Sequence, residues 1–218
     1  NPMALIEVDF PSRNGRDTIQ GWVYEPTVTP RAVVQIVHGL GEHSRRYFRL
    51  ITRLLDAGFV VAADDHAGHG STAMASGIWA DAGDDAAAVV VADEQTLRER
   101  VRALHPELPY VVYGHSWGSM IARAVAEESS DEIDGLVLGG IAARMRGLES
   151  TLDRAALAAE PDPTALAPDA NVAALFDGFT DRFGDDAGPT DWVARDGDVV
   201  RDHAVDPLNN FGAPMTVR

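Results

Sequence analysis

Residues 114–118, Gly-His-Ser-Trp-Gly, carry the most specific chemical signal of the sequence, because they fit the pattern Gly-x-Ser-x-Gly. An apolar stretch over 110–113 precedes them, and a helical stretch over 117–128 follows. A serine hydroxyl is a weak nucleophile, so it must protrude from a sharp strand-to-helix turn where a base can reach it. Since strand, turn and helix are in register, we interpret Ser116 as a nucleophile rather than as part of an ordinary glycine turn.

The second signal is the turn at residues 38–41, His-Gly-Leu-Gly, which follows the apolar run 32–37. Acyl transfer requires two backbone N–H donors aimed at the oxyanion, one after the nucleophile and one from an early loop at a strand end. Trp117 and Leu40 occupy these places and are the expected donors. Gly39 and Leu40 are also expected to contact the substrate. The structural alternative is a plain glycine turn.

Asp64, Asp65, His66 and His69 have the residue types of a metal site. These side chains are crowded on one loop and lack distant partners, whereas metal sites usually combine ligands from separate segments. We therefore expect a packed loop beneath the active site, and no metal.

Three other side chains are candidates for substrate contact rather than catalysis. His115 flanks the nucleophile but is expected to point away from it. Phe176 and Phe179 belong to a helical apolar stripe that is core in the first instance, and part of it is expected to line a substrate tunnel. His203 lies in a helical stretch and is expected to be exposed.

The elements that must position these residues alternate between strand and helix. Residues 6–10 and 19–24 form an opening hairpin around Asn14 and Gly15. The run 32–37 is typical of a strand buried on both faces of a parallel sheet. The pattern then predicts helix 48–55, strand 59–63, helix 84–104, strand 110–113, helix 117–128 and strand 136–138. This order predicts an α/β fold with a mostly parallel central sheet flanked by helices.

From about residue 143 the strand-like runs disappear, and Ala, Asp and Pro accumulate. Two helical stripes remain, over 148–159 and 172–183, with a linker at 160–169 that contains three prolines. We therefore expect a core at residues 1–142 and a helical cap at 143–218.

Composition narrows the possible partners and location. A chain of 218 residues with a formal net charge of −16 repels polyanions, which makes nucleic acid an unsuitable partner. The absence of cysteine excludes disulfides and thiolate chemistry. No apolar run is long enough to span a bilayer, and no signal peptide is recognisable at the start. We expect a cytoplasmic protein.

Four segments together resemble the monoacylglycerol lipase and lysophospholipase group of α/β-hydrolases, which is also classed with the serine aminopeptidases. They are HGLGEHSRRY at 38–47, DHAGHG at 65–70, GHSWGSM at 114–120 and DWVARDGDVVRDHAVDPL at 191–208. Trp117 departs from the Met that is common in monoacylglycerol lipases. A Trp there is similar to the GGSWGS elbow of proline iminopeptidases, although their HGGPG loop is absent.

The resemblance implies an α/β-hydrolase fold with Ser116 as nucleophile, Leu40 and Trp117 as oxyanion donors, and a lid over an acyl pocket. The expected reaction is the two-step hydrolysis of a carboxylic ester of the monoacylglycerol or lysophospholipid type, without a cofactor. One alternative is a proline iminopeptidase-like aminopeptidase, which would need an acidic cluster in the cap. Another is a non-catalytic binding protein with a hydrolase fold.

The acid and the base of this fold are expected in the chain order Ser, Asp or Glu, His, after the cap. Within the sequence, His203 and Asp198 or Asp202 have the wrong order and lie in the cap. We expect both groups, and the strands that carry them, outside residues 1–218. The sheet would then have an open apolar edge, suited to a separate C-terminal fragment or to a second copy of the chain.

Overall fold

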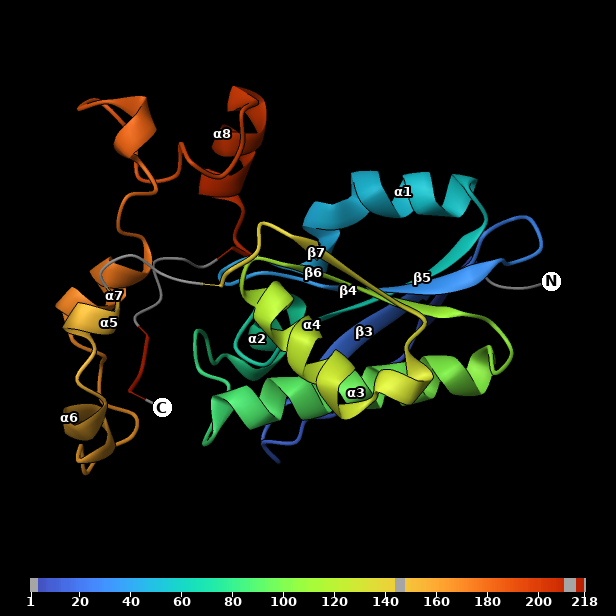
Figure 1. The fold of residues 1–218 in the computed structure, drawn as a ribbon, viewed down its shortest axis with the longest axis horizontal. Helices are drawn as coiled ribbons and strands as arrows, with labels where there is room; N and C mark the ends of the chain where they lie inside the picture. The colour runs from blue at the N-terminus through green and yellow to red at the C-terminus, as the bar shows by residue number, and fades with distance from the viewer. Residues whose placement is uncertain (1–3, 144–147, 210–214, 218) are drawn as a thin grey trace.

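The computed structural model describes residues 4–143, 148–209 and 215–217, and its centre is one mixed β-sheet (Figure 1). Its strands are β1 (Leu5–Glu7), β2 (Phe10–Pro11), β3 (Thr18–Tyr24), β4 (Ala32–Val37), β5 (Phe59–Asp65), β6 (Tyr110–His115) and β7 (Gly135–Gly139). They lie in the order β1-β3-β5-β4-β6-β7, with β2 paired to β3. β5, β4, β6 and β7 are parallel, and the opening strands are antiparallel. The predicted hairpin and parallel sheet are confirmed.

Helices cover both faces of the sheet (Figure 1). A 3-10 turn, η1 (Ser44–Tyr47), leads into α1 (Phe48–Asp56) on one face. The opposite face is covered by α3 (Ala86–Leu104) and α4 (Trp117–Glu128), and a second 3-10 turn, η2 (Ser130–Glu132), follows α4. The short helix α2 (Gly70–Ser76) follows β5 and was not predicted, because seven residues rich in Gly, Ser and Ala carry no apolar period.

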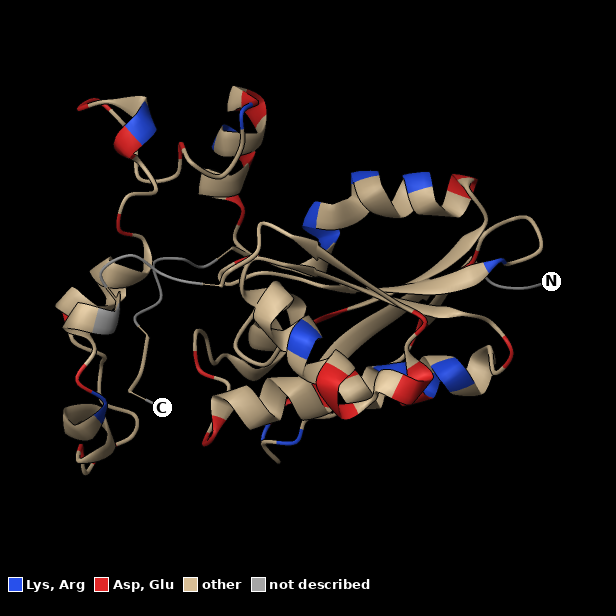
Figure 2. Ribbon diagram, in the orientation of Figure 1, with Lys and Arg blue, Asp and Glu red and all other residues tan. Residues whose placement is uncertain are grey.

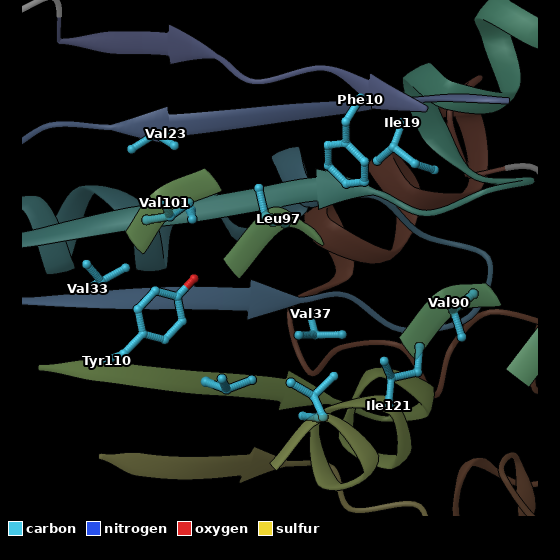
Figure 3. Packing of buried hydrophobic residues seen from close by; sticks show 14 of the residues in the cluster. Phe10, Ile19, Val23, Val33, Val37, Val90, Leu97, Val101, Tyr110 and Ile121 are labelled. Carbon is cyan, nitrogen blue, oxygen red and sulfur yellow. The ribbon is translucent and has the colours of Figure 1, made fainter. Parts of the chain in front are cut away.

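The predicted two-sided burial of β4 is confirmed, since all six of its residues are buried. Val34 and Ile36 belong to the apolar cluster beneath α1. Val33 and Val37 point to the opposite face, where they join the larger cluster around Leu97 of α3 (Figure 3). The alternation of a strand places successive side chains on opposite faces, so β4 ties the two apolar layers together.

After β7 the regular elements of the described chain are helical and gather beside the carboxyl ends of the parallel strands (Figure 1). They are α5 (Leu148–Thr151), α6 (Arg154–Ala158), α7 (Asp169–Leu175), the 3-10 turn η3 (Asp181–Phe183) and α8 (Gly197–Val205). This change supports the proposed division into a core at 1–142 and a cap at 143–218.

The cap sequence predicts two long helices, and both predicted lengths are wrong. The stripe over 148–159 is split, because the side chain of Asp153 accepts a hydrogen bond from the Ala156 N–H and starts a new helix. The stripe over 172–183 stops at Leu175, and Gly178 then takes a left-handed backbone with φ 80°. Apolar spacing alone did not reveal these local interruptions.

Within the described residues β7 pairs with β6 alone, so its other edge is open. Leu136 and Val137 on this strand are 39% and 50% exposed. This agrees with the open apolar edge that we expected.

The surface of the chain is predominantly acidic, as the net charge of −16 requires. Figure 2 shows acidic residues along the cap segments and at several loops, and basic residues along α1. None of the helices in the described ranges has the length and apolarity that a membrane crossing needs.

The packing of α3 leads to a first prediction. Leu97→Ala should lower the free energy of unfolding by about 2–5 kcal/mol, because it leaves a cavity in a fully buried position. Leu104 on the same helix is 45% exposed, and Leu104→Ala should cost less than about 1 kcal/mol. Urea unfolding followed by circular dichroism measures both values. Equal losses would contradict the packing of α3 described above.

Candidate active site

Ser116 lies in the sharp turn between β6 and α4, as predicted. β6 ends at His115 and α4 begins at Trp117, so the serine is the single residue between strand and helix. Its φ of 53° and ψ of −120° are values that residues with a side chain rarely adopt. Strain of this kind persists only when the surroundings impose it. One such restraint is the Ser116 N–H, which donates to the carbonyl of Gly139 at 3.0 Å.

The two glycines of the motif allow this turn to form. A Cβ at Gly118 would overlap with the carbonyl oxygens of Val37 and His38 at the end of β4. A Cβ at Gly114 would overlap with the Gly118 carbonyl and with Ala122 of α4. The missing side chains therefore let α4 approach the carboxyl ends of β4 and β6 closely.

The turn after β4 lies directly against the serine. A Cβ added to Gly39 would stand 3.3 Å from the Ser116 Cβ. The Gly39 N–H donates to Oε1 of Glu42 at 2.7 Å, and the Tyr47 hydroxyl donates to the same oxygen at 2.5 Å. Glu42 thus fixes the shape of the turn from outside the sheet.

The two predicted oxyanion donors, Leu40 and Trp117, belong to the two segments that meet at the serine. Leu40 follows Gly39 in the turn and lines the cavity above Ser116. Trp117 is the first residue of α4, where N–H groups have no partner within the helix and the helix dipole is positive. These positions suit the donor roles that the sequence predicts for both residues.

A cavity of about 250 Å³ opens over Ser116, between the core and the cap. The core lines it with Gly39, Leu40, Glu42, Arg46, Tyr47, Tyr113, His115 and Ser116. The cap lines it with Trp192, Val193, Val199 and His203. One wall is therefore polar and charged, and the other is mainly apolar.

Three residues predicted to contact the substrate line this cavity: Gly39, Leu40 and His115. Phe176 and Phe179 are not among the lining residues. Their ring centroids lie 5.9 and 4.8 Å from that of Trp192, which does line the cavity. The phenylalanines support a wall of the cavity from behind, and direct contact with substrate stays a prediction.

The expectation that His203 is exposed is wrong. The residue is buried, with an exposed fraction of 4%, and it lines the cavity from α8. Asn209 Nδ2 lies 3.1 Å from His203 Nδ1. Burial, and then the charge of Arg46, lower the pKa of His203. Which face of α8 points inward depends on how the cap docks on the core. The sequence of α8 alone does not determine this.

Sequence reasoning also missed several residues of the polar wall. Glu42, Arg46 and Tyr47 line the cavity, as does Tyr113 at the end of β6. The first three lie within the segment 38–47 that carried the family resemblance, so that segment held the available signal.

Ionic contacts join the cap to this same core segment. His43 Nε2 lies 2.8 Å from Oδ2 of Asp206, just after α8. The guanidinium of Arg46 lies 3.6 Å from Asp202 and 4.0 Å from Asp206. Arg46, which lines the cavity, and its neighbour His43 thus hold the cap over it.

Beneath the cavity, the four polar residues Asp64, Asp65, His66 and His69 are buried, as predicted. Their expected placement on one loop is wrong, because Asp64 and Asp65 are the last two residues of β5 and only His66 and His69 lie in the loop that follows. The Asp65 carboxylate accepts hydrogen bonds from the N–H groups of Ser44 and Ser71, at 2.8 and 2.7 Å. Asp65 therefore binds η1 and α2 to the end of the sheet.

Histidine rings are stacked between this loop and the two turns that carry His38 and Trp117. The His38 and His66 ring centroids are 3.7 Å apart, and His69 stacks on Trp117 at 5.3 Å. His69 Nδ1 lies 3.1 Å from the Ala67 carbonyl, to which it donates. Burial, followed by the charge of His66, lowers the pKa of His69 to about 4. His69 is consequently neutral at pH 7.

A serine on a strand-to-helix elbow, with a glycine-containing turn from the preceding parallel strand against it, defines the site of an α/β-hydrolase. The comparison with known families agrees. The sequence model of the family described as serine aminopeptidase, S33, matches residues 28–218. The chain belongs to this family.

Similar proteins include lipases and esterases. The chain is 32% identical to a monoacylglycerol lipase of Mycolicibacterium smegmatis over 191 residues, covering 87% of this chain and 60% of that protein. A solved structure described as a lipase in open form is 61% identical, with a TM-score of 0.93 over 98% of this chain and 70% of its own. A thermostable carboxyl esterase from Bacillus coagulans is 43% identical, with a TM-score of 0.93 over 100% of this chain and 70% of its own.

The close contact at Gly118 leads to a second prediction. Gly118→Ala should lower the free energy of unfolding by more than about 2 kcal/mol, because its methyl group meets rigid backbone rather than a movable side chain. Gly197→Ala in the first turn of α8 is the control, since its Cβ meets only the end of Arg201 at 3.4 Å. Thermal unfolding of both variants tests this, and an unchanged midpoint for Gly118→Ala would contradict the geometry.

A third prediction concerns pH. The unfolded chain takes up a proton on His69 near the ordinary pKa of 6.5, but the folded chain does so only near 4. The stability that a neutral His69 contributes is therefore full above pH 6.5 and is lost as the pH falls toward 4. Between about pH 7.5 and about pH 5, wild type should lose more stability than His69→Gln, which cannot titrate. Equal losses in denaturant unfolding would show that His69 titrates normally.

Proposed function

We propose that the chain carries the nucleophile and oxyanion turn of a serine hydrolase that cleaves carboxylic esters through an acyl-enzyme. The observation that carries this proposal is the strained Ser116 backbone at the β6–α4 turn, facing Gly39 and the cavity. A non-catalytic binding protein would gain nothing from this strain. Backbone strain of this kind is typical of functional sites.

In the proposed reaction, Ser116 Oγ attacks the ester carbonyl while a base removes its proton. The negative charge that forms on the carbonyl oxygen is stabilised by the N–H groups of Leu40 and Trp117. Collapse releases the alcohol, and water then hydrolyses the acyl-enzyme by the same steps. The chain spans 60% of the M. smegmatis lipase, and we propose that base and acid come from the part without a counterpart here.

The two walls of the cavity suit an ester with an apolar acyl group and a small hydroxylated alcohol. Trp192, Val193 and Val199 form the apolar wall, and Glu42 and Arg46 offer polar groups on the opposite side. Monoacylglycerols and lysophospholipids combine these two properties. The names of the similar lipases and esterases support this substrate class.

The family description also makes an aminopeptidase the main alternative. Recognition of a free amino terminus requires a carboxylate that faces the substrate. Among the described lining residues, the cap contributes no carboxylate, and the negative charge of Glu42 in the core is already matched by Arg46, whose Nε lies 4.0 Å from Glu42 Oε2. The cavity therefore favours an ester over a peptide.

A fourth prediction tests the nucleophile and the reaction class. Ser116→Ala, made in the protein that includes the proposed base and acid, should reduce p-nitrophenyl butyrate hydrolysis by at least about a hundredfold and abolish labelling by a fluorophosphonate. Wild type should hydrolyse this ester far faster than aminoacyl p-nitroanilides.

Ser130→Ala is the control, because Ser130 is exposed in η2. Circular dichroism should show the same fold for all three proteins. Ester turnover retained by Ser116→Ala would disprove the assignment of the nucleophile. A preference for anilides would instead favour the aminopeptidase.

A further inference from the structure

A second group of titratable residues lies below the catalytic turn and does not line the cavity. Asp64 at the end of β5, His66 just after it and Glu94 on α3 are each at most 1% exposed. His66 Nδ1 lies 3.3 Å from Asp64 Oδ1 and 3.2 Å from Glu94 Oε1. Both carboxyl groups thus face the same ring nitrogen.

The other ring nitrogen fixes the protonation of His66. Nε2 lies 3.2 Å from the backbone carbonyl of His38, and a carbonyl oxygen only accepts hydrogen bonds. Nε2 must therefore carry a proton to make this bond. Because Nδ1 faces carboxyl oxygens, it also has acceptors within reach. A ring that donates from both nitrogens is an imidazolium cation.

Two carboxylates and one imidazolium would leave a net negative charge in a dry interior, which is costly. A single proton shared by the two acids removes this net charge. Burial, and then the charge of Asp64, raise the pKa of Glu94. Burial alone lowers the pKa of His66, but the charge of Asp64 and the hydrogen bond to it outweigh this, so the pKa of His66 is raised.

His66 contacts the turn at residues 38–41 and the first residue of α4. Its backbone N–H donates to His38 Nε2 at 3.0 Å, and its ring stacks on that of His38. His38 in turn donates from Nδ1 to the Gly39 carbonyl at 2.8 Å, which fixes it as the neutral tautomer. The ring of Trp117 meets the edge of His66 at a centroid distance of 5.5 Å. His66 therefore contacts both segments that supply the proposed oxyanion donors.

We propose that His66 is a positioning residue for the oxyanion turn, held as a cation by Asp64 and Glu94, which share one proton. This inference rests on the proposed role of Ser116. The cation bonds to the carbonyl that precedes Gly39, and it keeps the Leu40 N–H aimed at the reacting oxygen. An imidazole that loses its Nδ1 proton can no longer donate to the carboxyl groups, and its charge attraction to them is lost.

The same three side chains could in principle hold a divalent cation, since their donor atoms lie within 4.8 Å of one another. A structural zinc site uses four ligands, and a catalytic one keeps a position open to water or substrate. The described residues supply three, in a place that solvent does not reach. A shared proton satisfies the charges without a fourth ligand.

The first experiment measures the protonation of His66 without substrate. Two-bond proton–nitrogen NMR of the full-length, nitrogen-15-labelled chain at pH 7 should show both His66 ring nitrogens protonated. The signals are assigned by their loss in His66→Asn. A neutral tautomer would overturn the proposal, and so would a stoichiometric divalent metal detected by mass spectrometry of the purified protein.

The second experiment tests the effect on catalysis with amide variants. Asp64→Asn or Glu94→Gln each leaves one carboxylate beside His66, so each single variant should keep most of the wild-type kcat for p-nitrophenyl butyrate. The double variant leaves none, and its kcat should fall on the order of tenfold or more with little change in KM. The loss should thus be strongly non-additive.

Asp93→Asn is the matched control, because Asp93 is a buried acid on the same helix that bonds Ser12 and the Arg13 N–H instead of His66. It should lower stability without lowering kcat. A kcat that follows the melting temperature in all variants, Asp93→Asn included, would overturn the positioning role. If the double variant does not fold, the NMR result for wild type and both single variants decides. Activity in Ser116→Ala would refute the proposed function separately, since the state of His66 is measured without turnover.

Discussion

The close approach of α4 to the end of β4 is the constraint on which the rest of the site depends. It exists because Gly118 presents only hydrogen to the carbonyl oxygens of Val37 and His38. With α4 held there, Ser116 has no room for an ordinary backbone and takes its left-handed conformation. The same contact brings the β4 turn within van der Waals reach of the serine, so Ser116 and the turn that carries Leu40 are positioned by one packing event.

A polar layer beneath this contact stabilises it from the side of the sheet. Asp65 joins η1 and α2 to β5, and the stacked His38 and His66 rings join β5 to the end of β4. Buried polar groups are costly unless they are bonded, and satisfied networks favour one arrangement over its alternatives. The site is therefore built on a rigid foundation, while its roof consists of short helices.

The sheet and the elbow could be predicted from the sequence, because local rules decide them: apolar runs specify buried strands, and the spacing of Gly114, Ser116 and Gly118 specifies the turn. The cap could not. Its helices break where Asp153 caps a new one and where Gly178 turns the chain, and the inward face of His203 depends on docking against the core. Glu94 was also missed, since a charged residue on a helix normally indicates a solvent-facing position.

The cap and the core respond differently to added salt, because different kinds of contact hold them. Apolar contacts hold the core together, and added salt barely weakens these. Charges hold the cap in part: Arg46 faces Asp202, whose side chain is 75% exposed, and also Asp206. Attraction between partly exposed charges is screened within about 10 Å at moderate ionic strength. We therefore expect higher ionic strength to loosen the roof of the cavity while Ser116 and its turn stay in place, so that access to the site varies with the salt around the protein.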